Sequence, residues 1–347
     1  MQIPKMLKPG AKVASICLSD GLASTFPDLY SLGKKHIEEH FGLHVVPMTN
    51  TFRSAEELYE NPRLRVDDFY EAWERSDIDG IISVIGGDDS IRLLRHLDST
   101  RIRKHCKIFI GSSDTTVTHL YLHQCGIRSF YGPAVLFGFA DTGGLYSYTS
   151  DSFRKSVMSN DPIGELKPFL GDSVAGYTSW KNPDPEKRPE TRLNPPWQWI
   201  NGTGLWTGRL FGGCIEVLSP LSMATRIWPS NTDFWNDKIL FLEYSKELAN
   251  PDFSLWFARN LAAQGILHCI KGLLLGRQHF SISNEDGTQI LESFRRVVVK
   301  EEHLQSLPII GNMDFGHVQP TLTLPYGALT EINCSSQTIS VLEAGVR

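Results

Sequence analysis

The first 150 residues alternate short apolar runs with longer segments in which apolar positions recur at helical spacing. The apolar runs predict buried strands at 12–18, 43–48, 78–87 and 106–111. The helical spacing predicts helices at 29–42, 62–77, 90–97 and 115–126. Strands that alternate with helices in this way form βαβ units around a parallel sheet. Ligands of such sheets bind beyond the carboxyl ends of the strands, so residues that directly follow a strand are candidates for function.

The pattern changes between residues 151 and 200, where proline, polar residues and tryptophan dominate and no regular period remains. A connection of this length is either disordered or functional. Trp180, Trp197 and Trp199 favour a functional segment, because disordered chains carry few large apolar rings. We therefore predict a tryptophan-rich connector or substrate loop at 151–200, called the connector below.

Strand and helix patterns return after the connector, with more glycine and a β-rich tail at 322–343. This arrangement predicts a second α/β domain in which antiparallel strands join the sheet. A chain of 347 residues is long for one domain and sufficient for two. The predicted division is an N-terminal domain at 1–150, the connector at 151–200 and a C-terminal domain at 201–347.

The composition narrows the classes of partner. The formal net charge is −5 and no long run of one sign occurs, which disfavours a nucleic acid as partner. No window approaches 18 uninterrupted apolar residues and the N-terminus lacks a signal-peptide pattern, so no membrane partner is predicted. The six cysteines are scattered without a CxxC pair, as is typical of reduced thiols. We expect a cytoplasmic protein.

A candidate nucleophile lies in the Ser112-Ser113-Asp114 turn, between the predicted strand at 106–111 and the following helix. A strand, a tight turn and a helix are the context in which G-x-S-x-G nucleophile elbows display a serine. The match here is partial, because Thr115 stands where the final glycine would be. The alternative is a helix N-cap, since serine and aspartate accept hydrogen bonds from the first backbone N–H groups of a helix. Both interpretations stay open at this point.

A nucleophilic serine needs a general base and a group that orients the base. His317 follows an apolar strand and a Gly316 turn, and Glu243 ends the near-continuous apolar run "KILFL". Either residue could instead be a satisfied structural group. Glu216 is a weaker candidate for the acid, because its neighbours indicate that it flanks a helix.

Gly86 and Gly87 supply flexible backbone N–H groups after the predicted strand at 78–87. A phosphate cradle is one use for them, although Asp88 and Asp89 follow at once and would repel a phosphate. Donation of a hydrogen bond to an oxyanion is the better use.

No metal or cofactor motif is found. His119 and His123 lie four residues apart, but no glutamate of an HExxH motif accompanies them, and structural roles are expected. The chain also has no G-x-G-x-x-G motif and no P-loop lysine. We predict no metal and no cofactor.

Taken together, these segments resemble the LD-carboxypeptidase family of serine peptidases and, within it, the microcin C self-immunity branch. The resemblance extends over essentially the whole chain, because the order and spacing of several short motifs agree. The motifs are "LKPGAKVASICLSDG", "DIDGIISVIGGDDSIRLLRHLD", "KIFIGSSDTTVTHLYLHQCGIRSFYGP", "WQWINGTGLWTGRLFGGCIEVL", "KILFLEYS" and "LPIIGNMDFGH…LTLPYGA".

The resemblance implies roles for individual residues. Ser113 matches the nucleophile of the family, Glu243 the orienting acid and His317 the base. The backbone N–H groups of Gly87 and Asp114 match the oxyanion hole. The implied fold is a flavodoxin-like parallel-sheet N-terminal domain with a smaller C-terminal α/β domain whose sheet is mixed and β-rich. The resemblance also implies a homodimer.

Departures from the wall-recycling members favour the self-immunity branch. The chain has "GGDDS" where those members have "GGYG", and it has "FGGC", with Cys214, where they have "GGN". Self-immunity members hydrolyse the amide-type bond between an aminoacyl group and an adenylate-like nucleotide. Trp180, Trp197 or Trp199 could stack on a purine, or could simply hold the connector to the domain. Gly86 and Asp88 are also expected to contact the substrate.

The resulting prediction is a serine carboxypeptidase-like hydrolase that acts through an acyl-enzyme on a small aminoacyl-nucleotide. One alternative is an LD-carboxypeptidase that removes terminal D-alanine from short wall peptides. Another is a non-catalytic module that binds a nucleotide or peptide. A cysteine hydrolase is weaker still, because Cys125 lies at the far end of its helix and gains nothing from the helix dipole.

Overall fold

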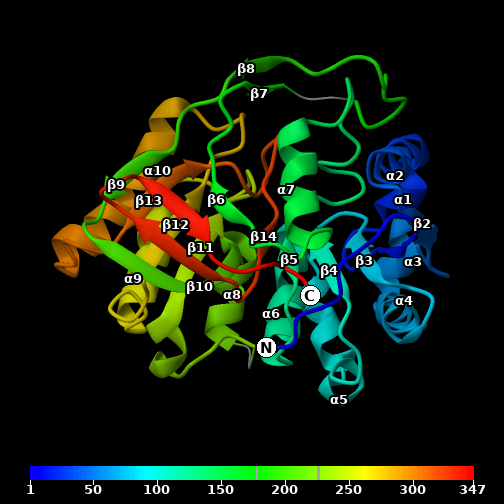
Figure 1. Cartoon of the computed structure of the whole chain (residues 1–347), viewed down its shortest axis with the longest axis horizontal. Coiled ribbons are helices and arrows are strands. Elements are labelled where there is room, and N and C mark those ends of the chain that lie inside the picture. Colours follow the sequence, from blue (N-terminus) through cyan, green and yellow to red (C-terminus); the bar gives the residue numbers. More distant parts are fainter. Residues whose placement is uncertain (177–178, 225–226) are drawn as a thin grey trace.

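The computed structural model describes residues 1–176, 179–224 and 227–347, which form two sheets and one small hairpin (Figure 1). The first sheet has six strands in the order β14-β5-β4-β3-β1-β2. Its strands are β1 (Lys12–Ile16), β2 (His44–Pro47), β3 (Gly80–Ser83), β4 (Ile108–Gly111), β5 (Phe130–Tyr131) and β14 (Leu324–Pro325). Strands β1 to β5 run parallel and only β14 pairs antiparallel. The parallel order 2-1-3-4-5 is that of flavodoxin-like folds, which confirms the predicted class.

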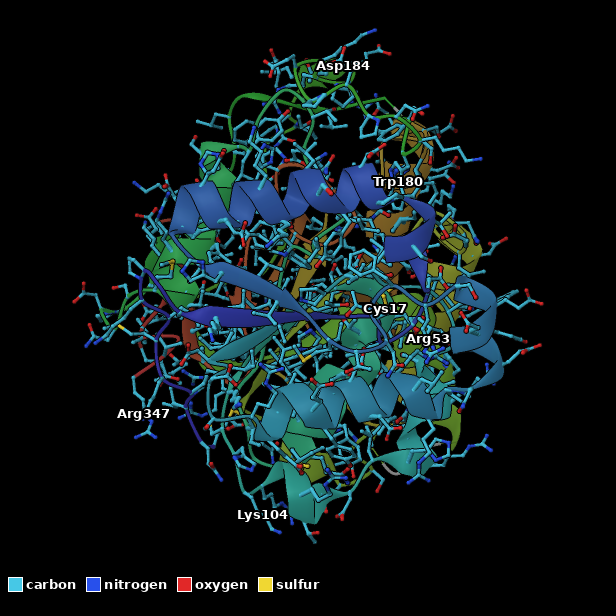
Figure 2. The ribbon with its side chains drawn as sticks, turned by 90° about the vertical axis from the view of Figure 1, so that its right-hand side faces the viewer. Cys17, Arg53, Lys104, Trp180, Asp184 and Arg347 are labelled. Atoms are coloured by element: carbon cyan, nitrogen blue, oxygen red, sulfur yellow. The ribbon has the colours of Figure 1, made fainter. Side chains whose placement is uncertain are left out.

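Helices cover both faces of this sheet, and Figure 2 shows α2 and α4 on opposite sides of its strands. The helices are α1 (Leu22–Thr25), α2 (Pro27–Phe41), α3 (Ala55–Glu60), α4 (Arg63–Glu74), α5 (Ser99–Ile102), α6 (Thr116–Gln124) and α7 (Ser147–Val157). Because side chains of a strand alternate between faces, Val13 packs with the α2 side, whereas Ala14 packs with the α4 side. The segment predicted as a helix at 90–97 forms a 3₁₀ helix at Ser90–His96.

The second sheet has eight strands in the order β6-β16-β15-β10-β11-β12-β13-β9. Its strands are β6 (Gly164–Leu166), β9 (Gln198–Asn201), β10 (Leu205–Cys214), β11 (Lys238–Glu243), β12 (Gly272–Gly276), β13 (Ile309–Met313), β15 (Leu329–Asn333) and β16 (Thr338–Val341). The centre, β10 to β13, is parallel, and antiparallel strands flank it on both sides. This is the predicted mixed, β-rich sheet.

Helices also pack on the second sheet, and its central strand β11 is buried along its whole length. They are α8 (Ile215–Ala224), α9 (Pro251–Ala263) and α10 (Asn284–Arg295), with a 3₁₀ helix at Thr232–Asp237 and a π-helix at Arg296–Glu301. Burial on both faces explains why β11 reads as a continuous apolar run. No helix within the described part of the chain is long and apolar enough to cross a membrane.

The connector contributes to the folded structure at both of its ends. Strand β6 pairs with β16, and β9 pairs with β13, so both belong to the second sheet. Between them, β7 (Asp172–Val174) and β8 (Thr191–Leu193) form an antiparallel hairpin, seen along the top edge of Figure 1. The boundaries at 150 and 200 stay a prediction, and α7 runs across the first of them.

Candidate active site

Ser113 lies in a strained turn between β4 and α6. Its φ is 59°, in the left-handed region that costs a residue with a side chain about 1–3 kcal/mol. Hydrogen bonds hold this conformation: the Ser113 N–H donates to the Tyr131 hydroxyl at 2.9 Å, and the Thr116 hydroxyl donates to the Ser113 carbonyl at 2.7 Å. The turn is therefore built to display one side chain, as a nucleophile elbow does.

None of the three side chains in the Ser112-Ser113-Asp114 turn caps the helix. Ser112 makes no cap hydrogen bond, and the Ser113 hydroxyl points to His317. The Asp114 carboxylate accepts from the Ser19 hydroxyl at 2.6 Å and the Ser90 N–H at 2.7 Å. The helix-cap alternative is therefore not what these side chains do.

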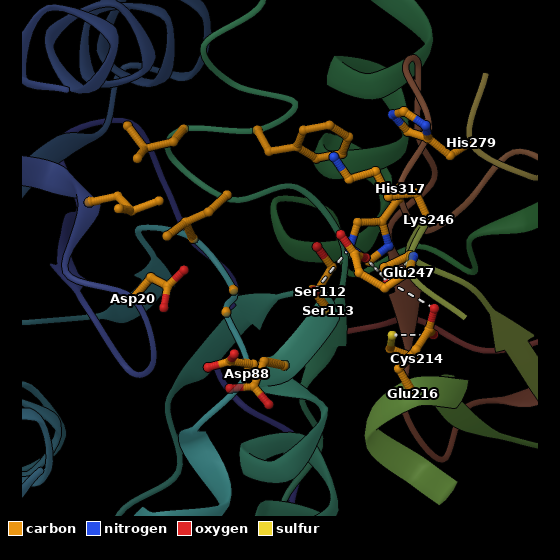
Figure 3. Close-up of a pocket in the computed structure, with 18 of the residues that line it drawn as sticks. Asp20, Asp88, Ser112, Ser113, Cys214, Glu216, Lys246, Glu247, His279 and His317 are labelled. Atoms are coloured by element: carbon orange, nitrogen blue, oxygen red, sulfur yellow. Dashed lines mark hydrogen bonds between the residues drawn. The ribbon is translucent and has the colours of Figure 1, made fainter. Parts of the chain in front are cut away.

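The structure brings the predicted serine, histidine and glutamate into one hydrogen-bonded chain, of which Figure 3 draws Ser113 and His317. His317 Nε2 lies 3.0 Å from the Ser113 hydroxyl, and His317 Nδ1 lies 2.7 Å from Glu243 Oε2. With Nδ1–H donating to the carboxylate, Nε2 is left to accept the serine proton. Ser113 follows β4 of the first sheet, whereas Glu243 ends β11 and His317 follows β13 of the second. The site therefore depends on how the two domains meet.

The Glu243 carboxylate is held by more than the histidine ring. Tyr131 donates its hydroxyl proton to Oε1, and the His317 backbone N–H donates to Oε2 at 3.3 Å. A Cβ built at Gly316, where φ is 92°, would overlap this carboxylate, and one at Gly276 would lie 2.7 Å from the Glu243 Cβ. Both glycines thus allow the backbone to enclose the acid, which is only 1% exposed.

Tyr131 was not identified from the sequence, yet its hydroxyl joins two members of the site. It accepts from the Ser113 N–H and donates to Glu243, which fixes the nucleophile turn relative to the acid. Burial and the negative charge of Glu243 raise its pKa well above the usual value, so the phenol keeps the proton that it donates. Its position at the end of β5, on the same sheet edge as Ser113, was the available signal.

The charges of the site favour an ionised acid beside a basic histidine. Burial alone would raise the pKa of Glu243, but His317 and the Tyr131 hydroxyl lower it below its usual value. Burial alone would lower the pKa of His317, but the Glu243 carboxylate outweighs burial and raises it above the usual value. Glu243 therefore stays negative at neutral pH and strengthens His317 as a base.

The predicted oxyanion donors lie beside the nucleophile. In the described part of the chain, the N–H groups of Gly87 and Asp114 donate to no protein acceptor. Gly87 has φ 149°, and a Cβ built there would lie 2.7 Å from the Asp20 Cγ. A Cβ at Gly86 would lie 2.7 Å from the Ser113 Cβ and 3.3 Å from the Asp114 nitrogen. The glycine pair thus packs directly against the serine turn.

The serine and histidine open into a cavity of about 1080 Å³ formed by both domains and the connector. Of the predicted substrate-binding residues, Gly86, Asp88 and Trp180 line it. Figure 3 shows Asp20 and Asp88 across the cavity from Lys246 and His279. The cavity is large enough for a drug-sized or nucleotide-sized ligand.

Trp197 and Trp199 lie outside the lining of this cavity. The Trp197 ring N–H donates to the buried Asp314 carboxylate at 2.8 Å, and Trp199 lies in β9 opposite Ile310 of β13. The structure therefore brings one of the three predicted tryptophans, Trp180, to the site, whereas the other two join the connector to the second domain.

Cys214 lies next to Glu243 and His317, and it hydrogen-bonds to Glu216. The Cys214 thiol donates to Glu216 at 3.2 Å, and the Ser245 hydroxyl donates to Glu216 at 2.8 Å. Burial and the charges of Glu243 and Glu216 raise the pKa of Cys214 well above its usual value, so this thiol is a poor nucleophile. Glu216 lies in the first turn of α8, inside the helix that the sequence predicts it to flank.

Among the described residues, one group has ligand atoms close enough to share a metal ion: Cys214, Glu243 and His317, within 4.8 Å of one another. Glu243 and His317 already hydrogen-bond to each other there. The sequence predicts structural roles for His119 and His123, and the contacts of His119 agree with this. His119 contacts the Ser129 hydroxyl at 2.8 Å and the Gly111 carbonyl at 2.9 Å, and burial lowers its pKa to about 3.

The class of the protein follows from comparison with known families. The family model of the LD-carboxypeptidase N-terminal domain matches residues 13–132, and that of the C-terminal domain matches residues 207–332. The chain therefore belongs to the LD-carboxypeptidase family, as its motifs predict, and is a hydrolase of the serine-peptidase type.

Individual relatives agree with this membership. The microcin C7 self-immunity protein MccF of Escherichia coli is 28% identical over 285 residues, which cover 80% of this chain and 78% of that protein. A putative carboxypeptidase of Vibrio cholerae is 25% identical over 350 residues, covering 100% of this chain and 99% of the relative.

Solved structures share the fold over nearly the whole chain. An MccF-like protein from Streptococcus pneumoniae in complex with AMP aligns with a TM-score of 0.83 at 25% identity, covering 95% of this chain and 98% of that one. An MccF-like protein from Bacillus anthracis aligns with a TM-score of 0.82 at 28% identity, covering 99% and 100%.

Proposed function

We propose that this protein hydrolyses the amide-type bond between an aminoacyl group and an adenylate-like nucleotide. The observation that carries the proposal is the hydrogen-bonded chain from Ser113 through His317 to Glu243, which opens into a cavity lined by Trp180. The likeness to a microcin C7 self-immunity protein and to an AMP-bound MccF-like protein supports the substrate class.

In the proposed mechanism, the Ser113 hydroxyl attacks the acyl carbon while His317 Nε2 removes its proton. Glu243 holds the Nδ1–H tautomer and stabilises the imidazolium that forms. The tetrahedral intermediate then collapses as His317 returns the proton to the leaving nitrogen, which leaves an acyl-enzyme on Ser113. Water, deprotonated by His317, attacks this ester and releases the amino acid.

The backbone N–H groups of Gly87 and Asp114 are proposed to bind the oxyanion of the intermediate. Both donors lack protein acceptors within the described chain, and the glycine pair packs against the Ser113 turn. Donors fixed in this way stabilise the charge that appears in the transition state more than the ground-state carbonyl.

Gly87→Ala is therefore expected to lower kcat by about 10²–10³-fold, the usual cost of losing one oxyanion donor. Alanine cannot easily keep φ 149°, and its Cβ would overlap Asp20, so the N–H would turn away. Steady-state kinetics measure the loss of kcat, and a thermal melt measures any loss of stability separately. Gly10→Ala is the control, because Gly10 has φ 89° but nothing within 4 Å of a built Cβ. An unchanged kcat in Gly87→Ala would contradict the role.

Trp180 is proposed to stack on the base of the nucleotide, with Gly86 and Asp88 contacting the substrate nearer the serine. The Trp180 ring meets the Phe26 ring edge-on at 5.3 Å, which fixes its orientation at the cavity wall. Stacking of a base on an aromatic ring contributes about 1–3 kcal/mol.

Trp180→Ala is expected to raise KM for an aminoacyl-nucleotide by about tenfold or more while kcat changes less, because stacking holds a part of the substrate that does not react. Kinetics on one substrate measure the split. Trp180→Phe is the matched control, since it keeps an aromatic face. A loss of kcat with KM unchanged would instead indicate that Trp180 supports the fold of the connector.

A second candidate function is removal of terminal D-alanine from wall tetrapeptides. The match to both LD-carboxypeptidase domain models favours it, as does a probable murein peptide carboxypeptidase of Bacillus subtilis, 26% identical over 294 residues. The non-catalytic alternative is disfavoured by the connected Ser113, His317 and Glu243 side chains. The homodimer and the cytoplasmic location stay predictions.

One assay separates the two substrates. Purified protein is offered an aminoacyl-sulfamoyl adenosine and, in parallel, a tetrapeptide ending in D-alanine, with Ser113→Ala as the control. Release of amino acid from the first, lost in the variant, supports the proposed function. Release of D-alanine alone supports wall recycling, and activity that survives in the variant contradicts the assignment of Ser113.

A further inference from the structure

One end of the active-site cavity contains buried polar atoms that have no hydrogen-bond partner among the residues that the structure describes. These are Asp141 Oδ2, Thr142 Oγ1 and Arg188 Nη1, and all three residues line the cavity. Asp141 and Thr142 are each only 4% exposed. A buried polar group left unpaired costs about 1–3 kcal/mol, so such a cluster in a cavity indicates a ligand that completes its hydrogen bonds.

The remaining atoms of these side chains are held in place. The Gln319 side-chain N–H donates to Asp141 Oδ1, which leaves Oδ2 as the oxygen without a partner. Arg188 Nη2 donates to the carbonyls of Gly143 and Gly144, both at 2.7 Å, and its guanidinium lies 4.0 Å from the centre of the Tyr146 ring. The unpaired atoms are thus preorganised.

This cluster is close to the reacting atoms along the chain. Gln319, which orients Asp141, is two residues beyond His317, a separation of at most about 7 Å between their Cα atoms. Arg188 comes from the connector, as does Trp180. The cluster is therefore connected through Gln319 to the chain segment of the catalytic histidine, and through Arg188 to the segment that carries the proposed base-stacking ring.

The kinds of atom present select the ligand chemistry. A carboxyl oxygen, a hydroxyl and a guanidinium N–H together both accept and donate hydrogen bonds, as a sugar hydroxyl does in return. Burial raises the pKa of Asp141 to about 8, against the lowering effect of Arg188, which also suits a neutral partner. An apolar group would leave all three atoms unpaired.

We propose that Asp141, Thr142 and Arg188 form a ribose subsite that binds the 2′- and 3′-hydroxyls of the nucleotide. Carboxylates bind ribose hydroxyls in this way in dinucleotide-binding folds. The proposal rests on the proposed function, because only a nucleotide leaving group places a ribose in this cavity.

The test compares an aminoacyl-sulfamoyl adenosine with its 2′,3′-dideoxy analogue, on the wild type and on Asp141→Asn. The wild type is expected to lose about 10–100-fold in kcat/KM on the dideoxy substrate, the value of one or two buried hydrogen bonds. Asp141→Asn is expected to lose activity on the ribose substrate and little more on the analogue. Asp20→Asn, which removes a different cavity carboxyl, should keep the wild-type ratio.

Equal rates on the two substrates in the wild type would overturn the subsite, and a buried water would then account for the unpaired atoms. No hydrolysis of either substrate would contradict the proposed function instead. Calorimetry then tests the subsite independently of catalysis, by comparing the dissociation constants of adenosine and 2′,3′-dideoxyadenosine. Binding of adenosine about tenfold tighter supports the subsite, and equal binding overturns it. If Asp141→Asn does not fold, Thr142→Val gives the same comparison.

Discussion

Ser113→Ala is expected to reduce kcat by at least about 10⁴-fold on whichever substrate the wild type hydrolyses. Without the hydroxyl no acyl-enzyme forms, and only water attack aided by the oxyanion donors remains. The variant keeps the Ser113 N–H bond to Tyr131 and leaves the Asp114 bonds to Ser19 and Ser90 intact, so the fold should persist. Single-turnover kinetics measure the loss of rate, and a thermal melt checks that the fold persists.

Ser112→Ala is the matched control for this loss. Ser112 lines the same cavity one residue earlier, but its hydroxyl makes no cap bond and does not reach His317. Its activity should stay within a few-fold of the wild type. If both variants lose activity equally, the nucleophile assignment fails and the turn itself is what matters.

Ser113, Glu243 and His317 could be chosen as candidates because each lies at or after the end of an apolar strand, whereas their individual roles were implied by the resemblance of the motifs. Glu243 ends β11, and Ser113 and His317 follow β4 and β13, where strand ends of α/β folds place functional groups. The missing final glycine of the elbow motif made Ser113 ambiguous. In the structure the first glycine of the motif, Gly111, allows the turn to close tightly. A Cβ built at Gly111 would lie 2.7 Å from the hydroxyl of Thr115, the residue that replaces the final glycine.

Other parts of the site could not be read from the sequence because they depend on long-range contacts. Tyr131 acts through a carboxylate 112 residues away, and the only signal in "SFYGP" is its place at the end of the two-residue strand β5. The sequence predicts the same substrate-binding role for Trp197 as for Trp180. The pairing of β9 with β13 instead places Trp197 against Asp314. Asp141 shows no local motif, and its importance follows only from burial without a complete set of partners.

Glu243→Gln is expected to lower kcat by about 10³–10⁴-fold, because an amide neither stabilises the imidazolium nor enforces the Nδ1–H tautomer. The amide is close in size, so Tyr131 and the His317 N–H can still contact it. Glu216→Gln removes a nearby negative charge that does not bond to His317, and it should lower kcat far less.

The pH profile separates this electrostatic role from a merely structural one. His317 works as a base only when neutral, so kcat/KM rises as the pH passes upward through its pKa. In the wild type Glu243 raises that pKa, which places the acid limb of the profile above the usual value for histidine. In Glu243→Gln the largest charge that raises the His317 pKa is gone, whereas burial, which lowers it, remains. The acid limb must therefore move to lower pH, and a limb that stays in place would show that Glu243 acts through packing alone.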